Sequence, residues 1–238
     1  MNKIKKRILL IIVIVFVLFA GVTSIYYYPM IIMPRVETGQ VPNTNVYSAN
    51  AMSAVFFVKA GSDYIMIDGG LSAKTLLASM EKININPNDV KWIFLTHSDG
   101  DHVNGITAFP NAKIYMSEDE FLLINGTAKR TIFGGNPMPS GIDIDNIGLL
   151  PNNQELLLNG TKIQCIKMPG HTIGAMVYLI DGKYLFSGDT VKIKDGDFSV
   201  HPYSMDKELS NKSIEKLKEL SKNCSLVLTS HYGYFSPK

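Results

Sequence analysis

Two histidines and two aspartates lie close together in the segment Thr96-His97-Ser98-Asp99-Gly100-Asp101-His102. The apolar run at residues 91–95 precedes them and predicts a buried strand. Imidazole nitrogens and carboxylate oxygens are common ligands of divalent metal ions. Gly100 makes it easier for the backbone to fold back, so that these side chains can converge. The spacing His-x-Asp-x-Asp-His at the end of a strand therefore predicts a metal-binding loop.

Three more polar loops follow apolar runs in the same way, and each carries a potential ligand. These ligands are His171 in a Pro-Gly-His-Thr sequence, Asp189 in a Ser-Gly-Asp-Thr sequence, and His231 directly after Ser230. Four of the five histidines in the chain thus occupy predicted strand ends. Because binding residues commonly lie in loops on a rigid scaffold, we expect these loops to converge on one cleft.

In order and spacing, these segments resemble the metallo-β-lactamase superfamily. The resemblance covers roughly residues 46–238 and includes Ile67-Asp68-Gly69-Gly70 at the end of an early strand. It implies a four-layer αββα sandwich with a dinuclear metal site at the edge between the two sheets. The hydrophobic pattern alone predicts only a mixed α/β (α+β) chain.

The resemblance also implies how the candidate ligands divide between two metal ions. Carried over residue by residue, the first ion would take His97, Asp99 and His171, and the second would take Asp101, His102 and His231, with Asp189 bridging the two.

Asp99 departs from the family pattern, in which a histidine commonly stands at this position. A carboxylate can also ligate zinc, so we expect Asp99 to replace the missing imidazole. In the alternative, Asp99 points away and only the second site binds an ion. As a ligand, Asp99 would make the site less positive and raise the pKa of its bound water. Its hard oxygen would also make manganese or iron more competitive with zinc.

The implied chemistry is metal-assisted hydrolysis, in which a metal-bound hydroxide attacks an ester, thioester, lactone or similar bond of a small-molecule substrate. Two divalent ions, most simply zinc, are the expected cofactors. Asp101 is the candidate catalytic residue, because it would lie near the hydroxide and could carry a proton. The alternative functions are a metal-binding or sensing protein with little turnover and an iron-dependent oxygenase of the same fold.

Three further residues are weaker candidates for substrate binding. Tyr232 and Tyr234 follow His231 and could donate a hydrogen bond to a developing oxyanion, although ordinary packing would also explain them. His201 matches no ligand position of the family, and we expect it in a loop that lines the pocket.

Composition limits the partners of the chain. Its 238 residues carry a net charge of only +2, so no nucleic acid partner is expected. The two cysteines, Cys165 and Cys224, are too few for a cysteine-based zinc site.

The N-terminus predicts a membrane segment. A basic cluster at residues 3–7 precedes the uncharged stretch 8–33, which is long enough to cross a bilayer of roughly 30 Å. Tyr26, Tyr27 and Tyr28 would lie at the membrane interface. We therefore expect an anchor at 1–33, a linker at 34–45 and a catalytic domain at 46–238, with a single span in the cell membrane and the catalytic domain extracytoplasmic. The alternative is secretion after cleavage of a signal peptide near residues 22–24.

The alternation of apolar and polar residues predicts the remaining elements. Helices are expected at 73–82, 102–109 and 205–222. Strands are expected at 54–58, 64–67, 91–95, 112–116, 155–158, 162–168, 175–180, 183–186 and 225–229. Residues 125–151 show no periodicity, and they are expected to form either the wall of a substrate pocket or a surface excursion.

Overall fold

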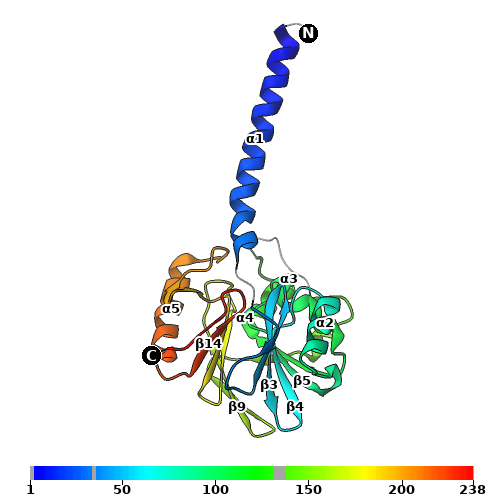
Figure 1. Ribbon diagram of the computed structural model, residues 1–238, viewed down its shortest axis with the longest axis vertical. Helices are drawn as coiled ribbons and strands as arrows, with labels where there is room; N and C mark the ends of the chain where they lie inside the picture. The colour runs from blue at the N-terminus through cyan, green and yellow to red at the C-terminus, as the bar shows by residue number, and fades with distance from the viewer. Residues whose placement is uncertain (1–2, 34–35, 131–137, 238) are drawn as a thin grey trace. The chain divides into compact units, whose positions relative to one another are not determined.

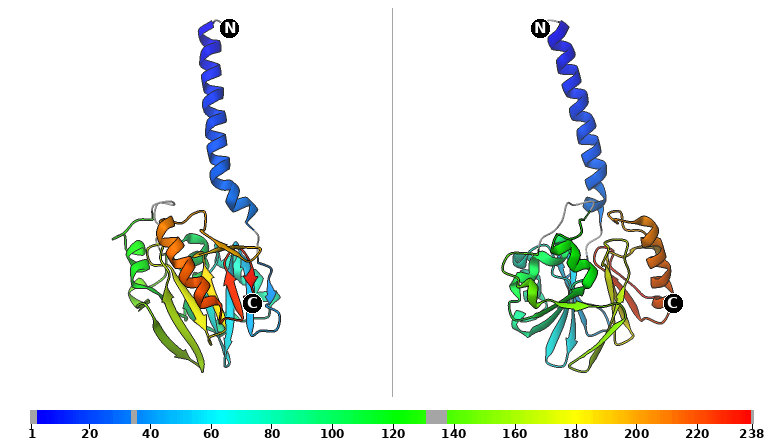
Figure 2. Two further views of the ribbon diagram at one scale, coloured as in Figure 1. Left: turned by 90° about the vertical axis from the view of Figure 1, so that its left-hand side faces the viewer. Right: turned by 180° about the vertical axis from the view of Figure 1, so that it is seen from behind.

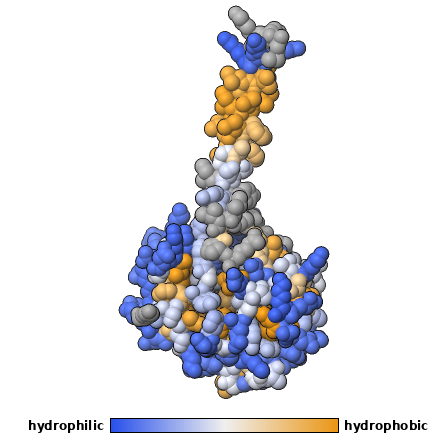
Figure 3. Space-filling view, viewed as in Figure 1, coloured by the Kyte–Doolittle hydropathy of each residue, from blue (hydrophilic) through white to orange (hydrophobic). Residues whose placement is uncertain are grey.

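The computed structural model describes residues 3–33, 36–130 and 138–237. The chain divides into two units, Met1–Pro34 and Arg35–Lys238. The first unit is one helix, α1 (Lys3–Ile32), in which Ile4–Ser24 is long and apolar enough to cross a membrane. Its apolar side chains form a continuous hydrophobic band beside the basic N-terminal end (Figure 3). A signal sequence would have the same composition, so the helix is compatible with either an anchor or a signal peptide.

The first sheet of the second unit contains seven strands in chain order. They are β1 (Gly39–Gln40), β2 (Val46–Ala51), β3 (Ser53–Ala60), β4 (Asp63–Ile67), β5 (Val90–Phe94), β6 (Lys113–Ser117) and β7 (Gly148–Leu150). Strands β1 to β4 pair antiparallel, and β4 to β7 pair parallel. The outer face carries α2 (Ala73–Lys82), α3 (Gly100–Val103), the 3-10 helix η2 (Asn104–Ala108) and α4 (Glu118–Ile124) (Figure 1).

The second sheet contains six strands. Their order is β15 (Tyr234–Phe235), β14 (Leu226–Thr229), β11 (Tyr184–Gly188), β10 (Met176–Ile180), β9 (Thr161–Lys167) and β8 (Gln154–Leu158). Helix α5 (Lys207–Ser221) covers its outer face (Figure 2). The remaining short elements are the hairpin of β12 (Lys192–Lys194) and β13 (Asp197–Ser199) and the 3-10 helices η1 (Pro87–Asp89) and η3 (Ile144–Asn146).

Alternating side chains on the central strands build three apolar layers. On β3, Phe56 packs into the core between the two sheets, whereas Phe57 packs beneath the helices of the first sheet. On β10, Tyr178 faces the core between the sheets and Val177 faces α5. Because successive side chains on a strand point to opposite faces, each central strand contributes to two cores. The four layers are helix, sheet, sheet and helix, which confirms the predicted αββα fold.

The candidate ligand loops meet because their strands end at one edge. Strand β11 is parallel to β14, and it is also parallel to β9, since β10 pairs antiparallel with both. Two backbone hydrogen bonds join the sheets at this edge. Met176 N–H donates to the Thr96 carbonyl at 2.9 Å, and Ala54 N–H donates to the Ser230 carbonyl at 2.8 Å. The loops after β5, β9, β11 and β14 are thereby held together.

The structure confirms the bounds of one predicted helix and changes those of another helix and of the linker. Helix α2 has the predicted bounds, but the helix expected at 102–109 begins at Gly100 and is 3-10 from Asn104. The expected linker 34–45 contains β1 and the buried side chains of Val36 and Val41, so the folded unit begins before residue 46.

Two other expectations concern the pocket wall and the cysteines. Part of the expected pocket wall, residues 131–137, lies outside the described residues, as do the side chains of Tyr26 and Tyr27. The thiols of Cys165 and Cys224 are buried and free, and they lie in different apolar layers.

Gly105 provides a test of the packing beneath the site. A Cβ atom at this position would lie 1.9 Å from the carbonyl oxygen of Gly69, a backbone atom with little freedom to move. We expect Gly105→Ala to lower the free energy of unfolding by about 3 kcal/mol, the upper range for overpacking a core. Gly39→Ala is the control, because its Cβ would meet nothing within 4 Å. Chemical denaturation of the detergent-solubilised chain would measure both, and equal stabilities would contradict the packing argument.

Candidate metal centre

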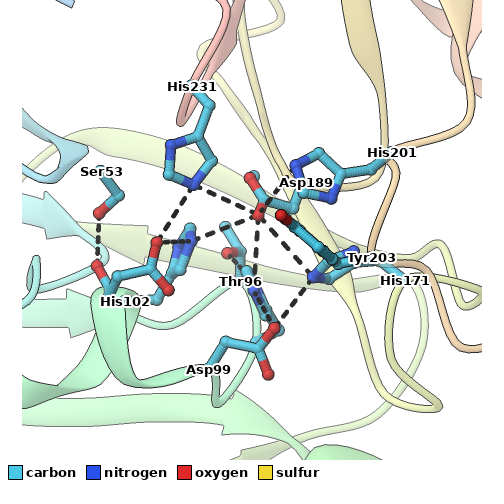
Figure 4. A network of polar contacts seen from close by, with 12 residues as sticks. Ser53, Thr96, Asp99, His102, His171, Asp189, His201, Tyr203 and His231 are labelled. Atoms are coloured by element: carbon cyan, nitrogen blue, oxygen red, sulfur yellow. Dashed lines mark hydrogen bonds and ion pairs between the residues drawn. The ribbon is translucent and has the colours of Figure 1, made fainter. Parts of the chain in front are cut away.

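The carboxylate of Asp189 lies at the centre of all five histidines of the chain (Figure 4). The distances from its Oδ2 to the Nε2 atoms are 3.4 Å for His231, 3.6 Å for His102, 3.6 Å for His201, 3.8 Å for His171 and 4.0 Å for His97. Asp189 is only 5% exposed. Such a cluster needs positive charge to offset the desolvation of a buried carboxylate.

The five imidazoles surround Asp189 as a closed ring of neighbours. Going around it, ring centroids lie 3.9 Å apart for His97 and His102, 5.7 Å for His102 and His231, 6.0 Å for His231 and His201, 4.9 Å for His201 and His171, and 4.6 Å for His171 and His97. Each histidine comes from a loop after a different strand, except His97 and His102, which share the loop after β5.

Asp101 lies between two members of this ring. Its Oδ2 is 3.2 Å from His231 Nε2 and 3.7 Å from His102 Nε2. Its side chain is 21% exposed, more than those of Asp99, Asp189 and the five histidines. Ser53 Oγ donates to the Asp101 main-chain carbonyl at 2.5 Å and fixes its position. Asp101 is thus a ligand candidate that also faces solvent.

Asp68 orients the ring of His102. Its carboxylate accepts hydrogen bonds from Thr96 N–H at 2.8 Å and from the Thr96 hydroxyl, and it contacts His102 Nδ1 at 2.9 Å. With Nδ1 engaged, Nε2 is the nitrogen that faces Asp189. A carboxylate behind a metal-binding histidine commonly fixes the ring in this way.

Glu120 ties together two of the ligand loops. Its carboxylate is buried and accepts hydrogen bonds from Ser98 N–H at 2.7 Å, Ser98 Oγ at 2.6 Å and Thr172 Oγ1 at 2.6 Å. Ser117 Oγ caps α4 by accepting from Glu120 N–H at 3.0 Å. The backbone N–H of Glu120 thus belongs to the helix cap, whereas its carboxylate binds the loops of the site.

Arg130 enters the site from the region in which the sequence shows no pattern. Its Nε donates to Asp99 Oδ1 and its Nη2 to Asp99 Oδ2, both at 2.8 Å. The same guanidinium donates to the backbone carbonyls of His171 at 2.9 Å and Tyr203 at 3.0 Å. A single arginine in an irregular segment carries no local feature that distinguishes it, so sequence reasoning missed this residue.

His201 lies within the cluster and not merely along a pocket wall. It is 2% exposed, and neither ring nitrogen has a hydrogen-bond partner among the described residues. It belongs to a group with His171 and Asp189 whose ligand atoms all lie within 4.8 Å of one another. The sequence pattern of the family offered no counterpart for this position.

The two tyrosines occupy different surroundings. Tyr232 is half-buried, its ring centroid lies 5.9 Å from that of His201, and burial raises the pKa of its phenol. It can therefore donate a hydrogen bond at the edge of the cluster. Tyr234 is 46% exposed and lines a hollow of about 400 Å³ with residues 36–42, Ser48 and Gly233, a lining that includes none of the histidines.

The pKa values of His171, His201 and Asp99 suit metal binding, which requires neutral imidazoles and ionised carboxylates. Burial would lower the pKa values of His102 and His231, but neighbouring carboxylates raise them, so these two imidazoles would release a proton when they bind an ion. Burial lowers the pKa of His171 to about 4 and that of His201 to about 3. Burial alone would raise the pKa of Asp99, but hydrogen bonds from His171, His97 and Arg130 outweigh it and hold this pKa well below its usual range. Burial would lower the pKa of His231, yet the nearby Asp189 and Asp101 raise it to about 9, so the cluster favours an added positive charge.

The buried nitrogen atoms also indicate a missing partner. Within the described parts of the chain, His97 Nε2, His102 Nε2 and both nitrogens of His201 have no hydrogen bond. Leaving such a group unsatisfied costs about 1–3 kcal/mol. The donor set of imidazoles and carboxylates therefore fits divalent cations held around Asp189.

The sequence profile of the Metallo-beta-lactamase superfamily matches residues 50–231, more than half of the chain. The chain belongs to this superfamily. Among curated proteins, a probable metallo-hydrolase of Methanocaldococcus jannaschii is 26% identical over 161 residues, which cover 66% of this chain and 64% of that protein. A probable polyketide biosynthesis zinc-dependent hydrolase of Bacillus subtilis is 33% identical over 106 residues, covering 43% and 40%.

A solved structure of the superfamily has the same fold. The archaeal metallo-beta-lactamase superfamily protein from Sulfolobus tokodaii is 22% identical, with a TM-score of 0.60, and the match covers 82% of this chain and 83% of that one. The chain spans less than two thirds of the length of the two curated relatives above.

Glu120 provides a test of how the superfamily site is assembled in this chain. We expect Glu120→Ala to weaken metal binding about 10–100-fold, the range for residues behind the ligands. The variant should also lose at least about 2 kcal/mol of stability, because Ser98 and Thr172 lose their buried acceptor. Glu118→Ala is the matched control, since Glu118 is an exposed residue of the same helical turn. Calorimetric zinc titration and thermal unfolding would check both, and unchanged zinc affinity in Glu120→Ala would contradict this role.

Proposed function

We propose that this chain is a metal-dependent hydrolase that uses a dinuclear centre around Asp189 to cleave an ester, thioester, lactone or similar bond of a small-molecule substrate. The observation that carries the proposal is the closed ring of five buried imidazoles around Asp189, with Asp101 at its exposed side. Superfamily membership supports the reaction type, as do relatives described as a metallo-hydrolase and a zinc-dependent hydrolase.

Each part of the site has a task in this reaction. Divalent ions, when bound, would supply Lewis acidity and an activated water molecule. His102 and His231 flank Asp101 and hold its carboxylate toward the cluster, within 3.7 Å and 3.2 Å of their Nε2 atoms. Because Asp101 is the most exposed carboxylate of the cluster, it can orient a water molecule and carry a proton toward the leaving group. Tyr232 can donate a hydrogen bond to the substrate oxygen as negative charge develops there.

The role of Asp101 can be tested by a neutral replacement. We expect Asp101→Asn to lower kcat about 10²–10⁴-fold on chromogenic esters, thioesters or lactones, because the amide cannot carry the proton. Asp197→Asn is the control, since Asp197 is an exposed residue of β13. The assays would use the full chain with zinc and, separately, with manganese.

The substrate panel also separates the proposal from its alternatives. It would include nitrocefin and bis-p-nitrophenyl phosphate, and a chelator should abolish any turnover. A fully metal-loaded chain that turns over no compound on the panel would instead indicate a metal-binding or sensing protein. Oxygen consumption with iron would indicate an oxygenase.

We also propose that α1 anchors the chain in the cell membrane, with the catalytic unit outside the cytoplasm. The support is the apolar span Ile4–Ser24 next to a basic cluster, which tends to remain on the cytoplasmic side.

Expression in bacteria would test this placement. We expect the full chain to remain in the membrane fraction after carbonate washing, and a fusion of alkaline phosphatase to its C-terminus to be active. A variant lacking residues 2–34 should be soluble and its fusion inactive. A mature chain that begins after residue 22 would show cleavage and secretion, and an inactive full-length fusion would reverse the topology.

A further inference from the structure

The Asp99 carboxylate is already engaged by a buried cation. Arg130 binds it in a bidentate pair, with one 2.8 Å hydrogen bond to each oxygen. The side chains of Arg130 and Asp99 are 1% and 9% exposed. Charge-assisted pairs of this geometry are among the strongest that proteins form. An ion bound by Asp99 would have to compete with a fixed guanidinium for the lone pairs of the Asp99 carboxylate.

The same guanidinium lies close to the expected first metal site. Its Nη2 is 3.3 Å from His171 Nε2, and it also donates to the Tyr203 carbonyl at 3.0 Å. An ion placed beside Asp99 would therefore be close to a positive charge. An ion placed away from Asp99, on the other side of His171, would avoid much of this repulsion.

His201 lies on that other side. Around Asp189, His171 is flanked by His97 at 4.6 Å and by His201 at 4.9 Å between ring centroids. Asp101 contacts the two remaining histidines, His102 and His231. Asp99 contacts two of the other three histidines in a similar way, because its Oδ2 lies 3.2 Å from His171 Nε2 and 3.6 Å from His97 Nε2. Arg130 hydrogen-bonds to both oxygens of Asp99, however, so this carboxylate has less negative charge to offer an ion than an unpaired one.

We propose that His201, rather than Asp99, completes the first metal site together with His97 and His171, and that Arg130 and Asp99 form a neutral pair that positions His171. The second site keeps Asp101, His102 and His231, and Asp189 is shared. All five histidines are then ligands. The imidazole that is absent at position 99 is supplied from the loop after β13, about a hundred residues later in the chain.

This assignment changes the expected metal preference. With Asp99 paired to Arg130, the first site has three nitrogen donors and no carboxylate apart from the shared Asp189. Nitrogen donors favour zinc over manganese, so the preference for harder ions predicted from Asp99 disappears. Arg130 is a positioning residue in this arrangement, because it acts through Asp99 and the His171 carbonyl.

The test measures metal binding and spectra of the full chain in detergent. We expect about two zinc or cobalt ions per wild-type chain. His201→Ala should bind one ion at least about 100-fold more weakly, a larger loss than for residues behind the ligands. It should also change the visible absorption of the cobalt-loaded chain. Ser204→Ala is the matched control, because it removes from the same loop a buried hydroxyl that has no hydrogen-bond partner among the described residues.

A double variant tests Asp99 without leaving Arg130 unpaired. Asp99→Asn combined with Arg130→Gln replaces the ion pair by two neutral amides that can hydrogen-bond to each other. We expect it to keep two tightly bound ions and the wild-type cobalt spectrum. Loss of one ion in this variant would show that Asp99 is a ligand and would overturn the proposal. So would His201→Ala with two tightly bound ions and an unchanged spectrum.

A measurement on the unaltered chain covers the case in which a variant fails to fold. With ¹⁵N-labelled histidine and bound cobalt, all five imidazoles should show the large shifts of coordinated rings, and an unshifted His201 would overturn the proposal. The inference rests on the proposed metal-dependent function, but none of these readouts requires turnover. A chain that binds ions through His201 and hydrolyses nothing would contradict the proposed function alone. Hydrolysis with an uncoordinated His201 would contradict this inference alone.

Discussion

Burial of the Asp189 carboxylate among five imidazoles is the constraint on which the site depends. A carboxylate at 5% exposure is costly to bury unless positive charge surrounds it. The five ring nitrogens within 4.0 Å of its Oδ2 form a shell that can present such charge through bound cations or protons. The architecture must therefore bring loops from both sheets to one point, and the parallel arrangement of β9, β11 and β14 achieves this.

Two other buried carboxylates hold these loops without facing the centre. Asp68 links β4 to the loop after β5 through Thr96 and His102. Glu120 links that same loop to the loop after β9 through Ser98 and Thr172. Both accept several hydrogen bonds from backbone and hydroxyl groups, which compensates for their loss of hydration. The precision of the ligand cluster thus comes from anionic groups behind it.

Features set by local sequence were predictable, whereas features set by distant partners were not. Helix α2 has its Ser72 cap within its own first turn, and the Asp181-Gly182 turn adopts the positive φ angles that its residue types favour. By contrast, Arg130 acquires its role from Asp99, which is 31 residues away, and the partner of His201, Asp189, lies in the loop after β11. The family pattern located the candidate ligand loops, but it could not reveal that the loop after β13 brings a fifth histidine to Asp189. Strand β7 was missed for the same reason, since its pairing with β6 spans a long irregular segment.

The guanidinium of Arg130 gives the site one cation that cannot diffuse away. A chelator can remove bound metal ions, but it cannot remove a positive charge that belongs to the chain. The loops carrying Asp99, His171 and Tyr203 all hydrogen-bond to this one group, so they stay connected when no metal ion is bound. Asp101 and His231 have no comparable fixed cation in the contacts described above. Without bound metal, the half of the centre held by Arg130 should therefore stay better ordered than the half with Asp101 and His231. It should also be the first half to bind an ion again.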